Sequence, residues 1–230
     1  MDIHIPYFDE TPQEPLSIVQ KDAFMKKNAS VIKKYPKNTQ IILDASSEYS
    51  LYLYSGLVKL SIFNEVGVER LLYYLKEKNS CVCGYPNVSM LLETIEDSEI
   101  YYVNTKQMLQ GIVFDEHLIN QLWESTHRRL GLMAERVLDI GGSSNKGKIC
   151  KLLYNLAQAS TLTDEHDRII VRQLPSRTDM ALYVGTHKAN VVKCLTQLEK
   201  NGIITRQGKG IIINNMEQLK TIIQEEYYQQ

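Results

Sequence analysis

The fold of the C-terminal part of this chain is decided by residues Ser176–Ile204, SRTDMALYVGTHKANVVKCLTQLEKNGII. The residues after Ser176 suit a short helix that this serine or Thr178 would cap, and the helical run stops at Gly185. Because glycine adopts a positive φ without strain, a tight turn is expected there, followed at once by a second helix. Two short helices joined in this way are typical of a DNA-binding helix-turn-helix.

The second helix is predicted to have an apolar face and a polar face. Its apolar residues recur at three- and four-residue spacing and form a stripe of Val191, Cys194, Leu195 and Leu198. The other face carries side chains that suit contacts with phosphates or base edges. With the flanking basic residues added, the predicted DNA-binding residues are Arg177, Thr186, His187, Lys188, Ala189, Asn190, Lys193, Arg206 and Lys209.

A wing is expected after this helix. Two apolar segments, Ile203–Thr205 and Ile211–Ile213, flank a glycine-rich turn and indicate a hairpin. Residues 171–210 hold seven Lys and Arg against two acids, a net charge of +5; since the whole chain carries −1, the rest carries −6. A basic end on an acidic body is expected where one domain meets phosphate groups.

The composition is that of a globular protein. The chain has 230 residues, enough for two ordinary domains, with 43% hydrophobic and 23% charged residues. The first fifteen residues lack a basic region followed by an apolar run, and no long apolar stretch could span a membrane. We therefore expect a cytoplasmic protein with no membrane partner.

Four cysteines are too few for a disulfide framework in a chain of this size. Cys81 and Cys83 are too close together for a relaxed disulfide and lack neighbouring ligands for zinc, so they are either reduced structural residues or a thiol sensor. Cys150 and Cys194 lie on apolar helix faces and are predicted to be core residues. No metal and no cofactor is expected.

The N-terminal half is predicted to be a small β-roll. A helical segment is expected over residues 16–34, before several short strands between residues 35 and 103. Its candidate inward positions are Ile18, Phe24, Met25 and Ile32. Asn64–Gly67 fits a hairpin turn, and Gly56 breaks a long strand at a corner. Regular short strands with such breaks are typical of a jelly-roll barrel.

A long helix is expected over residues 117–140, after a shorter one at 106–114. Its apolar residues step by four and three in turn and form a heptad seam of Ile119, Trp123, Thr126, Leu130, Met133, Val137 and Ile140. This stripe either packs on the roll or meets a partner helix, and its narrow width over more than three heptads favours a symmetric homodimer. The Gly141-Gly142 pair that follows is predicted to be a hinge.

The chain resembles the Crp/Fnr family of bacterial transcription regulators along nearly its whole length. The resemblance rests on four segments: LYSGLVKL (53–60), Gly67 with LLYYL (71–75), KLLYNLA (151–157) and MALYVG (180–185). The resemblance implies an α+β fold: a cyclic-nucleotide-binding-like β-roll, or double-stranded jelly roll, that senses an effector (1–115), a dimerisation helix and hinge (116–141), and a C-terminal winged helix-turn-helix (142–230). LLYY (71–74), Asn79-Ser80 and Tyr85-Pro86 are most similar to the CprK branch, which responds to chlorinated phenols.

Departures from the family pattern limit the effector. Residues 80–102, which correspond to the phosphate-binding segment of cyclic-nucleotide sensors, contain four acids and no Lys or Arg. Cyclic nucleotide is therefore not expected, and neither is an iron–sulfur cluster, since the first cysteine is Cys81. The resemblance instead implies a small aromatic, or halogenated phenolic, ligand held by Tyr74, Ser80, Cys81, Val82, Cys83, Gly84, Tyr85 and Arg129. The roll tyrosines are equally compatible with an ordinary barrel core.

The recognition helix also departs from the family, whose members commonly read G·C pairs with arginine and glutamate. Here those positions carry Lys188, Ala189 and Lys193. Alanine accepts no hydrogen bond from cytosine but contacts a thymine methyl, and Asn190 suits adenine. We predict double-stranded DNA with an A·T-rich inverted repeat as the partner, with RNA polymerase as a further candidate partner.

Two other hypotheses stay open at this point. A β-roll could be a cupin-like enzyme, but such enzymes need clustered histidine and carboxylate ligands, and the five histidines here are scattered. The other is a regulator of the same family that is switched by oxidation of Cys81 and Cys83 or by a small thiol. The prediction is a regulator and not an enzyme.

Overall fold

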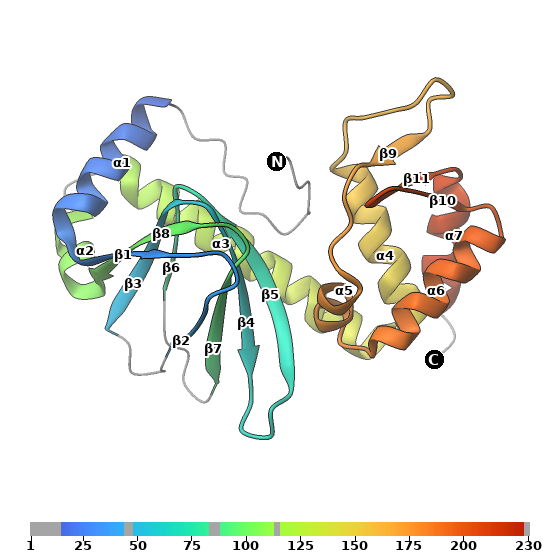
Figure 1. Cartoon of the computed structure of the whole chain (residues 1–230), viewed down its shortest axis with the longest axis horizontal. Helices are drawn as coiled ribbons and strands as arrows, with labels where there is room; N and C mark the ends of the chain where they lie inside the picture. The colour runs from blue at the N-terminus through green and yellow to red at the C-terminus, as the bar shows by residue number, and fades with distance from the viewer. Residues whose placement is uncertain (1–14, 44–47, 83–87, 113–115, 228–230) are drawn as a thin grey trace. The chain divides into compact units, whose positions relative to one another are not determined.

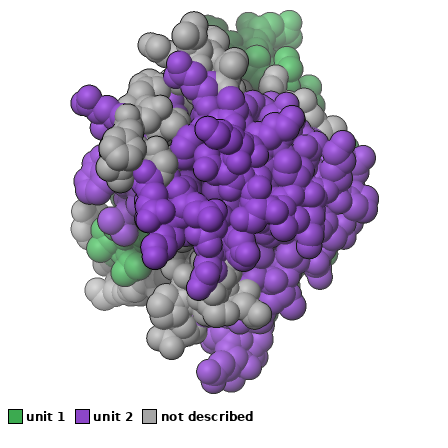
Figure 2. Space-filling view, turned by 90° about the vertical axis from the view of Figure 1, so that its left-hand side faces the viewer, with its two compact units in different colours: residues 1–6, 133–230 green, residues 7–132 purple. Residues whose placement is uncertain are grey.

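The computed structural model describes residues 15–43, 48–82, 88–112 and 116–227. The chain divides into two compact units, which among these residues are the roll unit, up to residue 132, and the winged unit, from residue 133 onwards. Figure 2 draws the roll unit in purple and the winged unit in green. In the part of the chain that the structure describes, no helix is long and apolar enough to cross a membrane.

The roll unit is built from two antiparallel four-stranded sheets, ordered β1-β8-β3-β6 and β2-β7-β4-β5 (Figure 1). The strands are β1 Ala29–Tyr35, β2 Gln40–Leu43, β3 Tyr49–Ser55, β4 Leu57–Phe63, β5 Glu69–Lys76, β6 Asn79–Val82, β7 Ser89–Thr94 and β8 Ser98–Asn104. The predicted roll is therefore confirmed.

Two predicted turns of the roll are also present. Gly56 joins β3 to β4 at φ 98°, and a Cβ there would lie 2.6 Å from the carbonyl oxygen of Asp97, so only glycine fits. At the tip of the β4–β5 hairpin, the Gly67 N–H donates to the Asn64 carbonyl oxygen over 2.9 Å. Both turns come from local backbone requirements, which is why the sequence predicts them.

The N-terminal helix is shorter than predicted. Helix α1 covers Pro15–Asn28, and the residues that follow form strand β1, so a helix through residue 34 was wrong. In β1, Ile32 pairs with Tyr101 of β8 and is 43% exposed, whereas Met25 of α1 is buried as predicted. Pairing with a distant strand decided the conformation here, because β-branched residues suit a sheet that is present to receive them.

The two central helices are α2 Thr105–Ile112 and α3 Glu116–Gly142. Along α3, the predicted seam residues Trp123, Leu130 and Val137 are 64%, 65% and 67% exposed. Trp123 and Leu130, which belong to the roll unit, are therefore not packed into its core. The helix continues through Gly141 and Gly142, so the pair lies in its last turn and not beyond its end.

The winged unit continues with α4 Asn145–Gln158, β9 Ile169–Val171, α5 Arg177–Val184, α6 Lys188–Lys200, β10 Ile204–Gln207, β11 Gly210–Ile213 and α7 Met216–Tyr227. Strands β10, β11 and β9 form an antiparallel sheet in that order. The buried side chains of α4 and α6 make the core: Ile149, Cys150, Leu152, Leu153, Leu156, Val191, Cys194, Leu195 and Leu198. This arrangement confirms the predicted winged helix-turn-helix, with α5 and α6 as its two helices.

Candidate nucleic-acid interface and sensor region

The turn between α5 and α6 has the predicted geometry. The Ser176 hydroxyl caps α5 by accepting from the Asp179 N–H over 3.0 Å. At the other end, Gly185 adopts φ 74° and ψ 39°, and its N–H donates to the Ala181 carbonyl oxygen. This left-handed residue stops α5 and redirects the chain into α6.

Helix α6 presents one face to the core and the other to solvent. Val191, Cys194, Leu195 and Leu198 are all buried, as predicted. His187 stands before the helix, and the predicted contact residues Lys188, Ala189 and Lys193 are exposed, as are Arg177 and Lys209 outside the helix. Exposed cations on a recognition helix are the arrangement that phosphate binding requires.

Asn190 and Thr186 are the two predicted contact residues that bond to each other. Both are half-buried, and the Asn190 side-chain amide donates to the Thr186 hydroxyl over 2.8 Å. This contact holds Asn190 against the start of α6. Recognition of adenine by Asn190 stays a prediction. One of its two amide hydrogens already donates to Thr186.

The wing is attached to the recognition helix by Arg206. This β10 residue donates to the Thr196 hydroxyl over 3.1 Å, and its Nε lies 3.3 Å from a Glu199 carboxylate oxygen. Both partners belong to α6. A side chain predicted to contact DNA thus also sets the position of the wing beside the helix.

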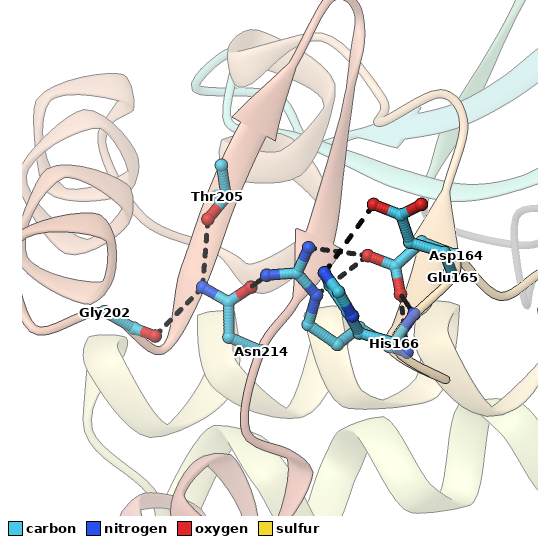
Figure 3. A network of polar contacts seen from close by, with 7 residues as sticks. Asp164, Glu165, His166, Gly202, Thr205 and Asn214 are labelled. Atoms are coloured by element: carbon cyan, nitrogen blue, oxygen red, sulfur yellow. Dashed lines mark hydrogen bonds and ion pairs between the residues drawn. The ribbon is translucent and has the colours of Figure 1, made fainter.

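A polar network below the wing was not foreseen from the sequence (Figure 3). Arg168 pairs with Asp164 over 2.6 Å and donates to the Asn214 side-chain oxygen over 3.3 Å. Asn214 in turn donates to the Gly202 carbonyl oxygen and to the Thr205 hydroxyl, over 3.0 and 2.9 Å. The network ties the loop before β9 to the start and the end of the wing. Hydrogen bonds from Arg168 lower the pKa of Asp164 to about 2.

A second network joins the first and last helices of the winged unit. The Ser144 hydroxyl accepts from the Gly147 N–H and donates to a Glu226 carboxylate oxygen, while Lys146 lies 2.9 Å from the other oxygen of Glu226. These contacts lower the pKa of Glu226. A Cβ on Gly147 would lie 2.8 Å from Glu226 Cβ, so a larger residue does not fit there.

The C-terminal end of α3 also contacts the helix-turn-helix within the winged unit. The Arg136 guanidinium donates to the Tyr183 carbonyl oxygen over 2.9 Å and lies 4.2 Å from the centre of the Tyr183 ring. Tyr183 is in the last turn of α5, two residues before the Gly185 turn. The contact therefore connects the long helix to the element that positions α6.

In the roll unit, the predicted effector residues are described only in part. Tyr74, Ser80 and Cys81 are buried. Cys83, Gly84 and Tyr85 lie outside the described residues, as does the side chain of Val82. The Arg129 guanidinium of α3 lies 5.2 Å from the centre of the Tyr73 ring. Tyr73 was not among the predicted effector residues. Successive residues of a strand point to opposite faces, so only one of Tyr73 and Tyr74 can place its ring beside the Arg129 guanidinium.

Two acids of the segment 80–102 form ion pairs with lysines of neighbouring strands. Lys59 of β4 lies 2.6 Å from Glu93 of β7, because the two residues are paired across the sheet. Lys34 of β1 lies 3.6 Å from Glu99 of β8. The absence of Lys and Arg within the segment therefore does not leave it without positive charge, a point that only strand pairing reveals.

Three tyrosines of the roll hold α1 in place. The Tyr52 hydroxyl donates to Asp22, and Lys78 lies 2.7 Å from the same carboxylate and 3.5 Å from the centre of the Tyr54 ring. Tyr54 stacks on Tyr101 at 5.1 Å. Burial raises the pKa of Tyr52, and it raises that of Tyr101 to about 12. For these three residues the structural role is the one the geometry favours.

The comparisons with known proteins agree with this architecture. Residues 147–222 match the Crp-like helix-turn-helix domain. The chain is 26% identical over 192 residues to the cAMP-activated global transcriptional regulator CRP of Salmonella typhimurium, an alignment that covers 79% of this chain and 89% of CRP.

Solved structures show the same fold. A CprK structure complexed with OCPA has a TM-score of 0.75 at 19% identity and covers 86% of this chain and 92% of CprK. A CooA mutant from Carboxydothermus hydrogenoformans has a TM-score of 0.79 at 16% identity and covers 93% and 97% of the two chains.

The winged helix-turn-helix, with its exposed basic helix, defines a DNA-binding transcription regulator. Over most of its length the chain is similar to Crp/Fnr regulators, and its DNA-binding part matches their helix-turn-helix domain. Its relatives are transcription regulators and not enzymes. Among the described residues, no group of three or more His, Cys, Asp and Glu side chains could hold a metal ion.

Proposed function

We propose that this protein is a homodimeric, effector-responsive transcription regulator that binds an A·T-rich inverted repeat. The observation that carries the proposal is that α6 and α3 each expose one face with a distinct chemical character. Helix α6 exposes cations and α3 exposes a heptad stripe of large apolar side chains. The first face suits DNA, and the second suits a second copy of the same helix.

The apolar stripe of α3 supports the dimer. Trp123, Leu130 and Val137 recur at seven-residue spacing and are each about two-thirds exposed in the single chain. A two-fold dimer places two copies of α6 about one turn of DNA apart, which requires an inverted repeat. The proposed division is a sensing domain of residues 1–115, a dimerisation helix at 116–141 and a DNA-binding domain at 142–230.

The effector is proposed to be a small aromatic acid or phenol. Its binding region would be formed by the buried residues of β5 and β6 together with Arg129 of α3. A guanidinium beside aromatic rings suits a ligand that is both aromatic and anionic. The CprK structure, a relative in fold, was solved with OCPA, and that ligand gives a starting compound for a screen.

We further propose that the signal reaches DNA through the last turns of α3. Effector binding would shift the paired helices, and the Arg136–Tyr183 contact would pass the shift to α5 and then to α6. Replacing Gly141 and Gly142 by alanine tests whether the glycines act as a hinge. Effector-dependent DNA binding that is unchanged in this variant would mean that the glycines are not needed.

The proposal is tested by three measurements on the full-length protein. Sedimentation velocity should give a dimer, and selection from a random DNA pool should return an A·T-rich inverted repeat. A thermal-shift screen with aromatic acids, cyclic nucleotides and small thiols should single out an aromatic acid, because a ligand that binds the folded state raises its melting temperature. A monomer, a TGTGA-like half-site or a shift with cyclic nucleotide would each contradict one part of the proposal.

A second candidate function is a thiol-responsive regulator of the same family. The observation that favours it is that Cys150 of α4 and Cys194 of α6 are both buried in the core of the winged unit, where the neighbouring Cys194 raises the pKa of the Cys150 thiol. Peroxide would convert one thiol to a sulfenic acid, and its condensation with the other thiol would release water and form a disulfide. DNA binding by wild type, Cys150→Ser and Cys81→Ser, with and without hydrogen peroxide, tests this. A peroxide response lost only in Cys150→Ser assigns the switch to the α4–α6 pair, and a response lost only in Cys81→Ser assigns it to the roll.

A further inference from the structure

The recognition helix exposes an aliphatic residue that the predicted DNA-binding set does not contain. Val192 is 43% exposed, whereas its neighbour Val191 is fully buried. Ala189, three residues before Val192, is exposed as well. Residues three apart lie on the same side of a helix, so the polar face of α6 contains a short apolar strip.

The strip lies between groups that suit the DNA backbone. Lys188 and Lys193, directly beside Ala189 and Val192 in the sequence, are both exposed. One turn after Val192, the Thr196 hydroxyl receives the hydrogen bond from Arg206 of the wing. The strip is thus bounded by two cations and by the wing, which places it on the surface that meets the major groove.

The apolar nature of the strip narrows what it could recognise. A valine side chain neither donates nor accepts a hydrogen bond, so it reads no polar edge of a base and gains nothing from a phosphate. The one apolar group that base pairs present in the major groove is the C5-methyl group of thymine. The amide of Asn190, the alternative A·T reader, is directed at Thr186 and sits half-buried at the start of the helix.

We propose that Val192 is a specificity-determining residue that recognises thymine through its C5-methyl group, beside Ala189. This inference rests on the proposed binding of an A·T-rich operator and assigns part of that preference to methyl contacts. Valine and alanine differ in reach, so the two residues would contact successive thymines of one strand, with Val192 making the larger contact.

Deoxyuracil provides a direct test, because it pairs as thymine does and lacks only the methyl group. An operator is first selected from a random pool with the full-length wild-type protein at low salt. Each thymine is then replaced by deoxyuracil in turn, and the dissociation constants are compared. At the thymine that Val192 contacts, replacement in one half-site should weaken binding about fourfold, the effect of losing one buried methyl-sized group.

Variants assign the effect to the residue. Val192→Ser should bind thymine and deoxyuracil equally at that position, and Val192→Thr, which keeps one methyl group, should retain part of the difference. Val66→Ser is the matched control, since Val66 is 82% exposed in the β4–β5 turn of the roll unit and should leave the ratio unchanged. Melting temperatures close to wild type establish that each variant folds; Val192→Ala replaces Val192→Ser if the serine variant melts early.

Two results would overturn the inference. One is equal binding of wild type to thymine and deoxyuracil at every position; the other is a wild-type ratio of the two dissociation constants in the folded Val192 variant, whether Val192→Ser or its replacement Val192→Ala. Failure of the proposed function is distinguishable from these results. In that case the selection enriches no sequence, or it returns a TGTGA-like half-site in place of an A·T-rich one, and this outcome is known before any thymine is replaced.

Discussion

The recognition helix of the winged unit and the sheets of the roll unit use their lysines differently. On α6, Lys188 and Lys193 are exposed on the face away from the core. In the roll, the Lys59 ammonium lies 2.6 Å from a Glu93 carboxylate oxygen, and the Lys78 ammonium lies 2.7 Å from one of Asp22. The two recognition-helix lysines are thus left on the surface, whereas these two roll lysines neutralise acids of their own unit; the winged unit contains such pairs as well, Arg168 with Asp164 among them. From the exposed lysines of α6 we expect the affinity for DNA to be set in the winged unit.

The largest expected effect comes from the helix that serves both units. Leu130→Glu places a charge in the apolar stripe of α3, so we expect a monomer and a loss of affinity for the inverted repeat of more than roughly 100-fold, because two linked half-sites bind far better than one. Sedimentation velocity and gel-shift titration measure the two effects. Leu109→Glu, at a leucine of α2 that is 52% exposed, is the control and should remain a dimer.

The next effect tests whether the cations of α6 meet phosphate. Replacing Lys188 and Lys193 by glutamine should weaken DNA binding roughly tenfold or more and reduce the dependence of affinity on salt, with the slope falling by about 3 to 4 for four lost contacts in a dimer. The same replacement at Lys220 of α7, which is also exposed, should change neither quantity. An unchanged salt slope in the first variant would show that these lysines do not contact phosphate.

A smaller effect concerns the network that holds the wing. The pKa of Asp164 is about 2 in the folded protein, below its usual value, so the carboxylate stabilises the fold above about pH 4 and the contribution is lost as the pH falls towards 2. We expect Asp164→Asn to lower the melting temperature at pH 7 and to flatten its decrease between pH 4 and pH 2. Glu165→Gln, at the adjacent exposed residue, serves as the control. If the melting temperature of Asp164→Asn fell between pH 4 and pH 2 as steeply as that of wild type, other carboxylates would cause the decrease.

The smallest effect is expected at the cap of α4. Ser144→Ala removes the hydroxyl that accepts from the Gly147 N–H, and an N-cap of this kind contributes about 1 kcal/mol to the free energy of unfolding. Because the Ser144 hydroxyl also donates to Glu226, Glu226→Gln should weaken the same contact and give a similar loss. Urea denaturation of both single variants and the double variant measures this. Fully additive losses would show that the two residues act separately.

The winged domain was more predictable than the roll, and the reason is the range of the interactions involved. The helix-turn-helix depends on contacts between near neighbours, such as Ser176 with Asp179 and Gly185 with Ala181. The end of α1 was predicted wrongly because it depends on the pairing of β1 with β8. Ile32 and Tyr101, which face each other in this pair, are about 70 residues apart in the chain. Val192 was overlooked because helical spacing alone placed it near the border between the two faces.

The sequence by itself determined the order of roll, long helix and winged domain, together with the turns at Gly56 and Gly185, the buried stripe of α6 and the heptad seam of α3. Each of these follows from local backbone preference or from periodicity. Only the tertiary structure decided which charges pair and which side chains stay exposed. Lys59 meets Glu93, Arg168 meets Asn214, and Val192 reaches solvent, because long-range packing brings together residues whose separation in the chain carries no signal.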